Sequence, residues 1–383
     1  MARPFDICIR GDGIVGHVLA LSLARERLRV GLVVPQADAG PTRPDVRAYA
    51  LNQQSRGLID GLRCWPEPHQ ATAVLAMQVR DVGGGAVNFD ATAQGVEALA
   101  WIVDVPVLEA RLAHAVQYQG GIELLAAAQD ARLSVICEGR ASATRAGLGV
   151  DMQTTAYGQW AIAARVQCGL AHAQAACQWF TPDDILGFLP LDGAAGNSMA
   201  IVWSVSKDRH AELMAADAQV FARELENACA RRFGDLALTS ARVAWPLQLA
   251  SAERWSGVSA GQSWVLAGDA AHVVHPLAGQ GLNLGLADVA ELVRQIAGRD
   301  YWREVNDEKL LRRYERTRKI SVLLMASATD GLQQLFARPG AAWAGLRNFG
   351  MGGFEQSGAV KRWVTQQAMG LQLPARAGNV KTQ

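Results

Sequence analysis

The hydrophobic pattern at the start of the chain predicts a strand, a tight turn, a helix and a second strand. Residues 5–9 (FDICI) form a short apolar run that ends at a glycine-rich turn. Beyond the turn, Ile14, Val18 and Leu21 recur at helical spacing, and the apolar run RVGLVV occupies residues 29–34. This order of elements is the βαβ unit with which dinucleotide-binding folds begin.

In the middle of the chain the pattern changes to that of antiparallel strands. Residues 72–100 predict a hairpin around the three glycines at 83–85. Between residues 157 and 205, four apolar runs follow one another without an intervening helical pattern, which predicts an antiparallel sheet. Residues 211–233 then predict one helix, because apolar positions recur among polar ones.

The last third of the chain returns to a strand followed by helices. Residues 263–268 (SWVLAG) predict a buried strand, and a glycine-rich loop leads from it into a helix over 281–297. Helical patterns follow at 308–336 and, more weakly, at 341–370, before a loose tail. The apolar stripe of the 281–297 helix consists of Leu282, Leu286, Val289, Val293 and Ile296.

Composition adds exclusions to this pattern. The chain has 383 residues, of which 50% are hydrophobic, and 37 basic against 36 acidic residues give a formal charge of +1. A nucleic-acid partner is not expected, because it would require a basic excess or a concentrated basic face. The N-terminus lacks the pattern of a signal peptide, and no run of about 18 apolar residues indicates a membrane span. These features favour a cytoplasmic protein whose six scattered cysteines are free thiols.

The first glycine turn has the spacing Gly11-x-Gly13-x-x-Gly16, with Ile14 and Val15 before its last glycine. Glycine permits the tight bend, lets the backbone approach a pyrophosphate, and brings the helix close to the strand. The N-terminus of the helix then favours the anion. We therefore expect these five residues to bind a dinucleotide cofactor.

Two features of this unit depart from the usual dinucleotide pattern. An acidic residue normally ends the second strand and binds the adenosine ribose, whereas this chain has Val34 there and its nearest acid is Asp38. Either Asp38 reaches in from the loop or adenosine binding is weakened. Asp12 also places a negative charge within the turn, near the expected pyrophosphate.

A second glycine-rich segment, GDAAHVVHPLAGQGLNLGLADV at 268–289, joins the predicted strand to the striped helix. It resembles the flavin-binding G-D motif of the group A flavoprotein monooxygenases, which have the para-hydroxybenzoate hydroxylase type of fold. Within that group it is similar to the ubiquinone-biosynthesis aromatic hydroxylases. The FAD-binding residues that the resemblance implies here are Gly268, Asp269, Pro276, Gly279, Gly281, Leu282 and Asn283.

Each part of this segment has an implied role. By the resemblance, Asp269 binds the ribityl chain and Pro276 lies beside the isoalloxazine. The backbone amides from Gly281 to Asn283 face the N1–C2 edge of the flavin, where a helix N-terminus stabilises the negative charge of reduced flavin. Pro276 and the Gly281–Asn283 run, which includes Leu282, are therefore flavin-edge candidates, and no catalytic residue is assigned.

A metal site is the alternative for this segment. His272, His275 and Asp269 could act as ligands, but they lack the helical spacing of known His-based motifs. A purely structural loop is the other alternative, and it does not explain four glycines, a proline and an asparagine between strand and helix. We expect flavin and no metal.

A third match lies at residues 137–145 (CEGRASATR), which resembles the middle motif A-D-G-x-x-S-x-x-R of the same group. The resemblance implies that Glu138 and Gly139 lie beside the flavin, with glutamate replacing the usual aspartate. The segment 45–62 also has a counterpart in the family, and there Arg47 would contact the flavin region. In the 101–116 counterpart, Val105 replaces a common asparagine.

The resemblance covers almost the whole chain and implies an α/β fold. A Rossmann-like FAD-binding domain of the para-hydroxybenzoate hydroxylase type would carry an inserted antiparallel-sheet substrate domain and C-terminal helices. The FAD-binding domain would be discontinuous. Its segments would be 1–71, 101–156 and 261–330, the substrate domain would comprise 72–100 and 157–260, and a C-terminal helical region and tail would occupy 331–383.

The implied activity is that of a monooxygenase in ubiquinone biosynthesis. FAD would be reduced by NAD(P)H as co-substrate, and O2 would hydroxylate a small apolar aromatic, by resemblance a polyprenylated phenol or quinone precursor. Such chemistry needs a dry pocket. The aromatic residues expected either to roof this pocket or to belong to the core are Trp160, Trp179, Phe180, Phe188 and Trp203.

Partners follow from the same substrate class. The segment 308–336 begins with basic residues, so it would either rest on the inner face of a membrane or form a solvated face followed by a core helix. A quinone-biosynthesis complex is another expected partner, and the sequence carries no signal for an oligomeric state. The basic residues in question are Arg312, Arg313, Arg316, Arg318 and Lys319.

Three other functional classes compete with the hydroxylase. The departures at Asp12, Val34, Val105 and Glu138 would suit a weakly FAD-binding homologue that serves as a structural partner. A second class is another flavin oxidoreductase of the same fold, such as a reductase or halogenase. A plain NAD-dependent dehydrogenase is disfavoured, because it predicts no G-D loop near residue 268.

Overall fold

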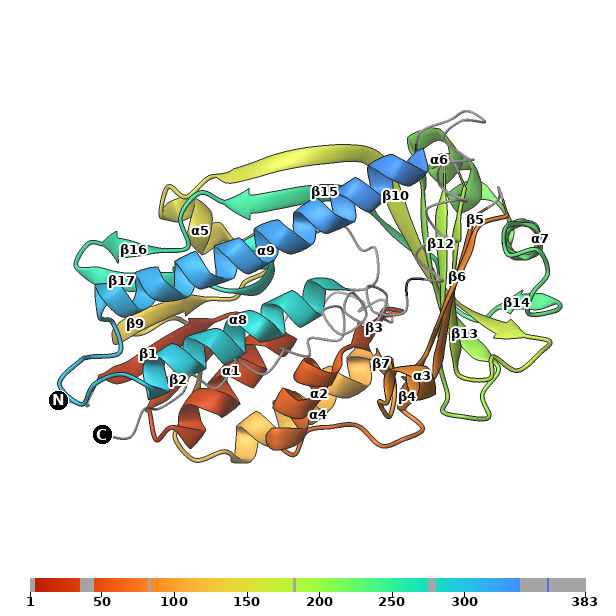
Figure 1. Ribbon diagram of the computed structural model, residues 1–383. Coiled ribbons are helices and arrows are strands. Elements are labelled where there is room, and N and C mark those ends of the chain that lie inside the picture. Colours follow the sequence, from red (N-terminus) through yellow and green to blue (C-terminus); the bar gives the residue numbers. More distant parts are fainter. Residues whose placement is uncertain are drawn as a thin grey trace, which may run out of the picture.

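A computed structural model shows two large sheets joined by long strands (Figure 1). It describes residues 4–34, 45–81, 84–181, 184–274, 280–337 and 357, with only the backbone for 328–337. One sheet is mainly parallel and is packed with helices, whereas the other is mainly antiparallel and lies at the far end of the molecule. The expected α/β fold with a Rossmann-like core is confirmed.

The six-stranded sheet contains the predicted βαβ unit. Its order is β16-β17-β9-β1-β2-β8, and all neighbours except the β16–β17 hairpin run parallel. Every strand from β17 to β2 is largely buried, which explains the continuous apolar runs in the sequence. The strands are β1 (Phe5–Arg10), β2 (Val30–Val33), β8 (Ile122–Leu125), β9 (Ala131–Ile136), β16 (Ser256–Ser259) and β17 (Gln262–Leu266).

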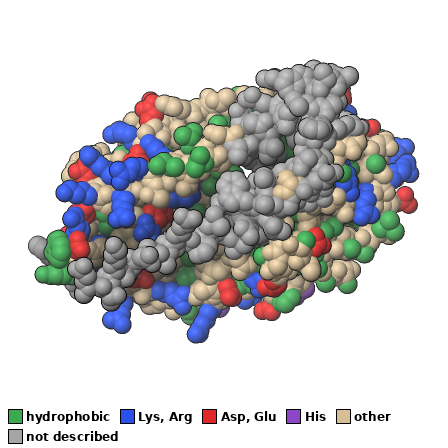
Figure 2. All heavy atoms as spheres, viewed as in Figure 1, with side chains coloured by type: hydrophobic (Ala, Val, Ile, Leu, Met, Phe, Trp, Pro, Cys, Tyr) green, Lys and Arg blue, Asp and Glu red, His purple; other side chains and the backbone are tan. Residues whose placement is uncertain are grey.

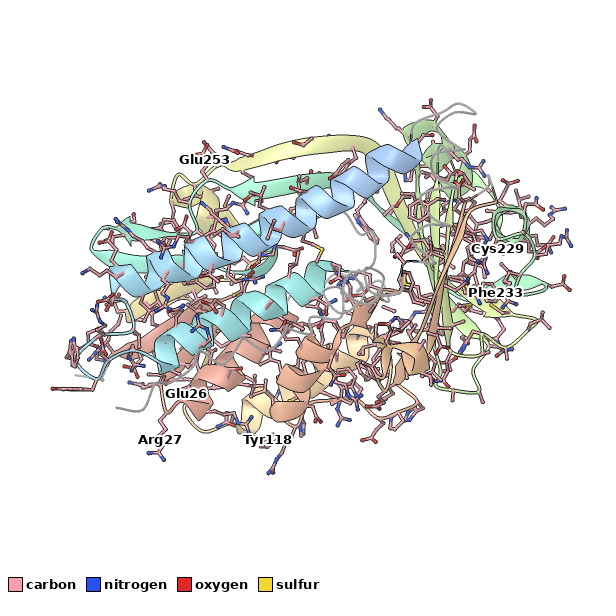
Figure 3. The ribbon with its side chains drawn as sticks, in the orientation of Figure 1. Glu26, Arg27, Tyr118, Cys229, Phe233 and Glu253 are labelled. Atoms are coloured by element: carbon pink, nitrogen blue, oxygen red, sulfur yellow. The ribbon has the colours of Figure 1, made fainter. Side chains whose placement is uncertain are left out.

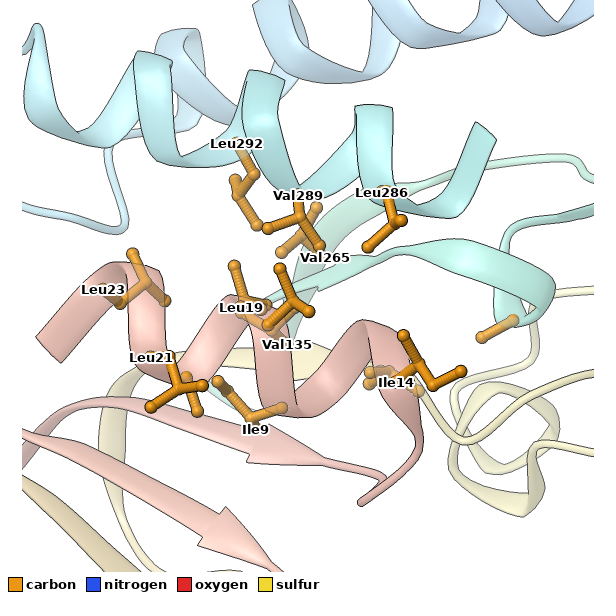
Figure 4. Packing of buried hydrophobic residues seen from close by; sticks show 14 of the residues in the cluster. Ile9, Ile14, Leu19, Leu21, Leu23, Val135, Val265, Leu286, Val289 and Leu292 are labelled. Atoms are coloured by element: carbon orange, nitrogen blue, oxygen red, sulfur yellow. The ribbon is translucent and has the colours of Figure 1, made fainter. Parts of the chain in front are cut away.

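Helices cover this sheet in layers. Helix α1 (Ile14–Arg25) lies between the sheet and α8 (Gln280–Ala297), and α9 (Glu308–Ala337) packs on α8. In Figure 4, Leu286, Val289 and Leu292 lie on the side of α8 that faces α1, so the predicted apolar stripe faces the core. Three more helices of this half are α2 (Gln53–Gly61), α4 (Val105–Tyr118) and α5 (Ala143–Gly147), whereas the short α3 (Ala91–Gln94) packs beside strand β6 (Ala86–Asp90).

The nine-stranded sheet confirms the predicted antiparallel region. Its order is β18-β15-β10-β13-β12-β11-β5-β6, with β14 beside β10, and β11–β5 is its parallel pair. The predicted hairpin of 72–100 is formed by β5 and β6. The strands are β5 (Ala76–Asp81), β6 (Ala86–Asp90), β10 (Met152–Cys168), β11 (Ala175–Phe180), β12 (Ile185–Pro190), β13 (Ser198–Ser206), β14 (Leu236–Leu238), β15 (Val243–Ala252) and β18 (His272–Val273).

A small antiparallel sheet lies between the two large ones. Its order is β3-β7-β4, with β3 at Ala48–Leu51, β4 at Ala71–Val74 and β7 at Ala100–Asp104. Strand β10 crosses the domain limit that we placed between residues 156 and 157. It pairs with β15 from the Met152–Ala252 end to the Ala163–Val243 end, so one two-stranded ribbon runs between both halves of the molecule.

The prediction of one helix over 211–233 is wrong. The chain forms α6 (Lys207–Ala215) and α7 (Ala218–Ala228) instead. Ala216 is extended, with ψ 149°, and the side chain of Asp217 accepts a hydrogen bond from the Val220 amide as the N-cap of α7. A capping aspartate thus starts a new helix where the apolar spacing alone suggested continuity.

The predictions for the C-terminal part have different outcomes. Helix α9 confirms the helical pattern of 308–336, whereas the predicted 341–370 helix and the tail lie outside the described residues. Within the described ranges, no helix is long and apolar enough to cross a bilayer.

Candidate cofactor and substrate sites

Two glycines of the first turn are required by close backbone contacts. Gly11 has φ +114°, and a Cβ placed there would lie 2.4 Å from the carbonyl oxygen of Cys137. A Cβ on Gly16 would lie 1.9 Å from the carbonyl oxygen of Gly11. No side chain fits at either position, so these glycines bring the ends of β1 and β9 together with the first turn of α1.

Gly13 differs from its two neighbours because it faces open space. A Cβ there would meet no atom within 4 Å, and Gly13 is the N-cap of α1 without a side-chain cap. The amides of the first helical turn therefore donate no hydrogen bond to a capping side chain. This open, uncapped helix start fits the approach of a pyrophosphate.

The second glycine-rich segment packs directly against the first. Gly268 has φ +64°, and a Cβ there would lie 3.3 Å from the side chain of Val15. A Cβ on Gly285, in the second turn of α8, would lie 2.9 Å from the same side chain. Val15 therefore wedges between the loop after β17 and helix α8, and it brings the two predicted cofactor motifs together.

Asp269 is accessible to solvent although protein surrounds it on most sides. Desolvation by that surrounding protein raises the pKa of its carboxyl, and the positive groups of His272, Arg140 and Arg47 oppose the rise. A carboxylate that is reachable yet enclosed can accept hydrogen bonds from the hydroxyls of a bound polyol chain. This placement fits the ribityl-binding role that the resemblance implies.

A buried group of Asp288, His272 and Arg318, which sequence reasoning missed, supports the loop that carries Asp269. The carboxylate of Asp288 accepts hydrogen bonds from the Gly268 amide (2.9 Å) and from Nε of Arg318 (2.7 Å), and Nε2 of His272 lies 2.6 Å away. All three side chains are at least nine-tenths buried. Burial alone would raise the pKa of Asp288, but His272 and Arg318 lower it overall. His272 thus turns to Asp288, and the ring also stacks on Trp255 at 5.0 Å.

The middle motif at 137–145 forms hydrogen bonds within itself and to the loop that carries Asp269. The carboxylate of Glu138 accepts hydrogen bonds from the hydroxyls of Ser142 (2.7 Å) and Thr144 (2.6 Å). These bonds lower its pKa against the effect of desolvation. The buried Arg145 donates to the carbonyl of Ala270 at 3.1 Å, so the motif braces the Asp269 loop. Gly139, with φ +76°, faces space that is empty within 4 Å.

The side chain of Asn283 connects the start of α8 to other segments by hydrogen bonds. Its amide oxygen accepts hydrogen bonds from the Asn52 amide (3.0 Å) and the Ser55 hydroxyl (2.7 Å), and its Nδ2 donates to the Ala50 carbonyl (2.8 Å). The start of α8 is thereby fixed to β3 and α2. A Cβ on neighbouring Gly281 would meet no atom within 4 Å, which leaves this helix start approachable.

Other predicted residues have different positions. Arg47 donates to Asp45 through Nε (2.9 Å), and this hydrogen bond raises its pKa. Leu282 packs against the main core with part of its side chain exposed. Four residues of the sequence argument lie outside the described ranges, namely Asp38, His275, Pro276 and Gly279.

A cavity of about 250 Å³ lies between the nine-stranded sheet and the small β3-β7-β4 sheet. Arg47 and Gln280 line the end near the cofactor motifs, whereas Met77, Phe89 and Leu99 line the opposite end. The described lining includes three residues with ionisable side chains, Arg47, Tyr49 and Cys177, and Cys177 turns its side chain to the other face of the sheet. Burial raises the pKa of Tyr49 and raises that of Cys177 to about 11, so both are neutral near pH 7.

None of the five aromatics expected for a roof lines this cavity. Phe188 and Trp203 are fully buried against α7, on the other face of the sheet. Cys229 and Phe233, labelled in Figure 3, belong to the same cluster on that side. Trp160 stacks on His210, and Phe180 belongs to a small cluster with Ile185. Phe180, Phe188 and Trp203 are therefore core residues, Trp179 packs against that core, and Trp160 is half-buried outside it.

Comparisons with known proteins agree with this site. Residues 126–328 match the family described as an FAD binding domain. The chain is 31% identical to the ubiquinone hydroxylase UbiL of Rhodospirillum rubrum, over 95% of this chain and 89% of that protein. It is 29% identical to the 3-demethoxyubiquinol 3-hydroxylase of Escherichia coli, over 96% and 99% of the two chains.

Solved structures support the fold. The p-nitrophenol 4-monooxygenase PnpA of Pseudomonas putida has a TM-score of 0.75 at 17% identity, with 96% of this chain and 99% of that chain covered. The probable FAD-dependent monooxygenase pqsL of Pseudomonas aeruginosa has a TM-score of 0.74 at 20% identity, over 91% and 99%. The chain therefore belongs to the family of FAD-dependent monooxygenases that includes the ubiquinone hydroxylases.

Proposed function

We propose that this enzyme hydroxylates an aromatic ring that carries a long apolar substituent, as a step of ubiquinone biosynthesis. The observation that carries the proposal is the shape and lining of the cavity. Its lining residues run from Trp245 on β15 to Phe89 on β6. Six strand spacings separate these strands, which is about 29 Å measured along the sheet at about 4.8 Å per spacing. A single ring would contact only a few of these strands.

Bound FAD supplies the electron transfer from NAD(P)H to dioxygen that a monooxygenase needs. In the overall reaction one oxygen atom enters the ring as a hydroxyl, the other leaves as water, and NAD(P)H gives up two electrons. The residues that we propose to hold the cofactor are those of the two glycine segments and the middle motif. Gly13 and the α1 amides would bind the pyrophosphate, Asp269 the ribityl chain, and the start of α8 the flavin edge.

The remaining work of the chain is to orient the ring and to exclude water. The cavity wall is formed mainly by small and aliphatic side chains, and its cofactor end lies beside Gln280 at the start of α8. Among the described lining residues there is no carboxylate and no histidine. A dry wall of this kind protects a reactive oxygen species from hydrolysis and side reactions.

The direct test is substrate-dependent oxidation of NAD(P)H by the FAD-loaded protein. We expect a phenol with a long alkyl or prenyl chain to stimulate oxidation more than phenol itself, and mass spectrometry should show one added oxygen atom. Loss of the gene should cause a less hydroxylated quinone precursor to accumulate. Absence of any stimulated oxidation together with unchanged quinone synthesis would rule the proposal out.

We also propose that α9 contacts an anionic membrane surface. Ile320, Leu323 and Leu324 are 55%, 66% and 67% exposed. Arg312 and Arg316 are exposed on the preceding turns, and Figure 2 shows basic side chains gathered over this helix next to hydrophobic ones. Basic residues near an anionic surface contribute about 1 kcal/mol each. Arg318, by contrast, is buried against Asp288 and takes no part.

Vesicle sedimentation tests the membrane proposal. The protein should sediment with vesicles that contain phosphatidylglycerol and less with pure phosphatidylcholine vesicles. The double variant Leu323→Ser, Leu324→Ser should lose this binding. Tyr118→Ser is the control, because Tyr118 is 77% exposed at the edge opposite α9 (Figure 3). Equal sedimentation of all three proteins would contradict a role for α9.

A further inference from the structure

Gln178 is a polar side chain on the cavity wall that the fold does not use. It lies on β11 and lines the cavity, with its side chain only partly exposed. Its neighbours Cys177 and Trp179 face the other way, since Cys177 belongs to the buried cluster under α7 and Trp179 packs on Phe233. Because side chains alternate along a strand, Gln178 points into the cavity.

The strand register gives Gln178 free space. Gln178 pairs with Gly187 on β12, Gly187 pairs with Val202 on β13, and Val202 pairs with Ala163 on β10. All four line the cavity in one row across the sheet. A Cβ on Gly187 would meet only the Val202 carbonyl, at 3.7 Å. The amide of Gln178 therefore lies beside a position that has no side chain.

No residue that the structure describes forms a hydrogen bond with the side-chain amide of Gln178. The side chains of Asn283 and Glu138, by contrast, have protein partners. A polar group surrounded by apolar side chains is unfavourable unless it finds a partner. A glutamine amide can donate to a carbonyl oxygen and can accept from a hydroxyl. Its expected partner is therefore a polar atom of a ligand.

We propose that Gln178 is a specificity-determining residue that hydrogen-bonds an oxygen substituent of the substrate ring. The inference rests on the proposed function, since it assigns a contact within the same cavity. The bond fixes the rotation of the ring in the cavity and so selects the ring carbon that faces the flavin. The apolar substituent then extends along the aliphatic lining of the cavity.

The test uses the FAD-loaded protein with two probes, hexylphenol and hexylbenzene, which differ in one hydroxyl. Dissociation constants are measured from the change in flavin absorbance. In Gln178→Leu we expect hexylphenol to bind about tenfold more weakly, or 1.4 kcal/mol, and hexylbenzene to bind no more weakly than to the wild type. Gln178→Met serves as a second variant, because its flexible side chain packs easily.

Gln78→Leu is the matched control. Gln78 lies on the adjacent strand β5 and pairs with Cys177, so the same change is made on the face turned away from the cavity. It should leave the ratio of the two constants unchanged. Equal weakening of both probes in the Gln178 variants, or no weakening of hexylphenol, would overturn the inference.

The outcomes also separate this inference from the proposed function. If hexylphenol distinguishes wild type from Gln178→Leu but stimulates no NAD(P)H oxidation in either, the contact stands and the hydroxylase assignment fails. If oxidation is stimulated equally in both proteins, the hydroxylase assignment stands and the contact is wrong. Failure of hexylphenol to bind the wild type would overturn the contact.

Discussion

Around the two glycine segments, three polar side chains are hydrogen-bonded to protein, whereas one glutamine on the cavity face of the nine-stranded sheet is not bonded to any described residue. Asp288, Glu138 and Asn283 each have two or more protein partners. Gln178 has none among the described residues, and its row is completed by Gly187, Val202 and Ala163. The difference separates a cofactor side that is fixed before binding from a substrate side that leaves room and hydrogen-bonding capacity.

This contrast has an energetic reason. A cofactor site must hold backbone amides in place, and fully satisfied buried networks give that rigidity. A site for a long apolar ligand instead needs space, which small residues provide along the sheet. Mutations should therefore act on stability on the cofactor side and on ligand binding on the substrate side.

The largest effect should come from Gly16→Ala. The new Cβ would lie 1.9 Å from the Gly11 carbonyl oxygen, so α1 must move, and we expect a loss of about 3 kcal/mol or more in unfolding free energy. Gly13→Ala is the control, because a Cβ there meets nothing within 4 Å. It should cost less than about 1 kcal/mol in urea unfolding of FAD-free protein, while FAD retention falls. Equal stability of the two variants would contradict the contact.

Asp288→Asn should be the next largest. It leaves Arg318 without a buried counter-charge and removes the partner of His272, and breaking such a group costs about 3–5 kcal/mol. Urea unfolding at pH 7 measures the loss. Glu97→Gln removes the exposed pair with Arg56 and should change stability by less than about 1 kcal/mol. A small effect at Asp288 would mean that the buried group does not brace the Asp269 loop.

Gly187→Val should act mainly on binding. The added carbons extend into the cavity, so we expect unfolding free energy within about 1 kcal/mol of the wild type. Hexylphenol should bind about tenfold more weakly, as filling the cavity removes its contact area. Gly57→Ala, on the exposed side of α2, should leave binding unchanged. Unaltered binding in Gly187→Val would show that the ligand does not cross this row.

The smallest effect concerns pH. The pKa of Asp288 is lowered in the folded protein, so its stabilising contribution is present above its unfolded value, about 3.9, and is lost as pH falls toward the folded value. The stability difference between wild type and Asp288→Asn should therefore be constant from pH 7 to 5 and should shrink below pH 4. Urea unfolding across this range checks the trend, and a difference that grows on acidification would contradict it.

The glycine segments could be predicted from the sequence because their constraints are local. Gly11 and Gly268 need left-handed backbone, and the strands around them are continuous apolar runs. The helix stripe of 281–297 was equally local. The same reasoning failed at Ala216. There the apolar spacing continues from one helix into the next, but Asp217 caps and starts a second helix.

Non-local contacts could not be predicted. Asn283 bonds residues 228 and 231 positions away, and Arg318 reaches Asp288 across 30 positions. Nothing in the local pattern marks such partners. Alternation along β11 to β13 shows that Trp203 and Val202 face opposite sides, but which side meets α7 and which meets the cavity depends on how the sheet packs.

The strand order of the parallel sheet has a consequence for how the chain is made. Ile7 pairs with Leu133, and Leu133 pairs with Ser263. Strands that are neighbours in the sheet are therefore synthesised at well-separated times. At about 5–20 residues per second, roughly 7–26 s pass between synthesis of β9 and synthesis of β17. During that interval β9 has an open apolar edge. We expect the nascent chain to depend on chaperones until α8 has emerged.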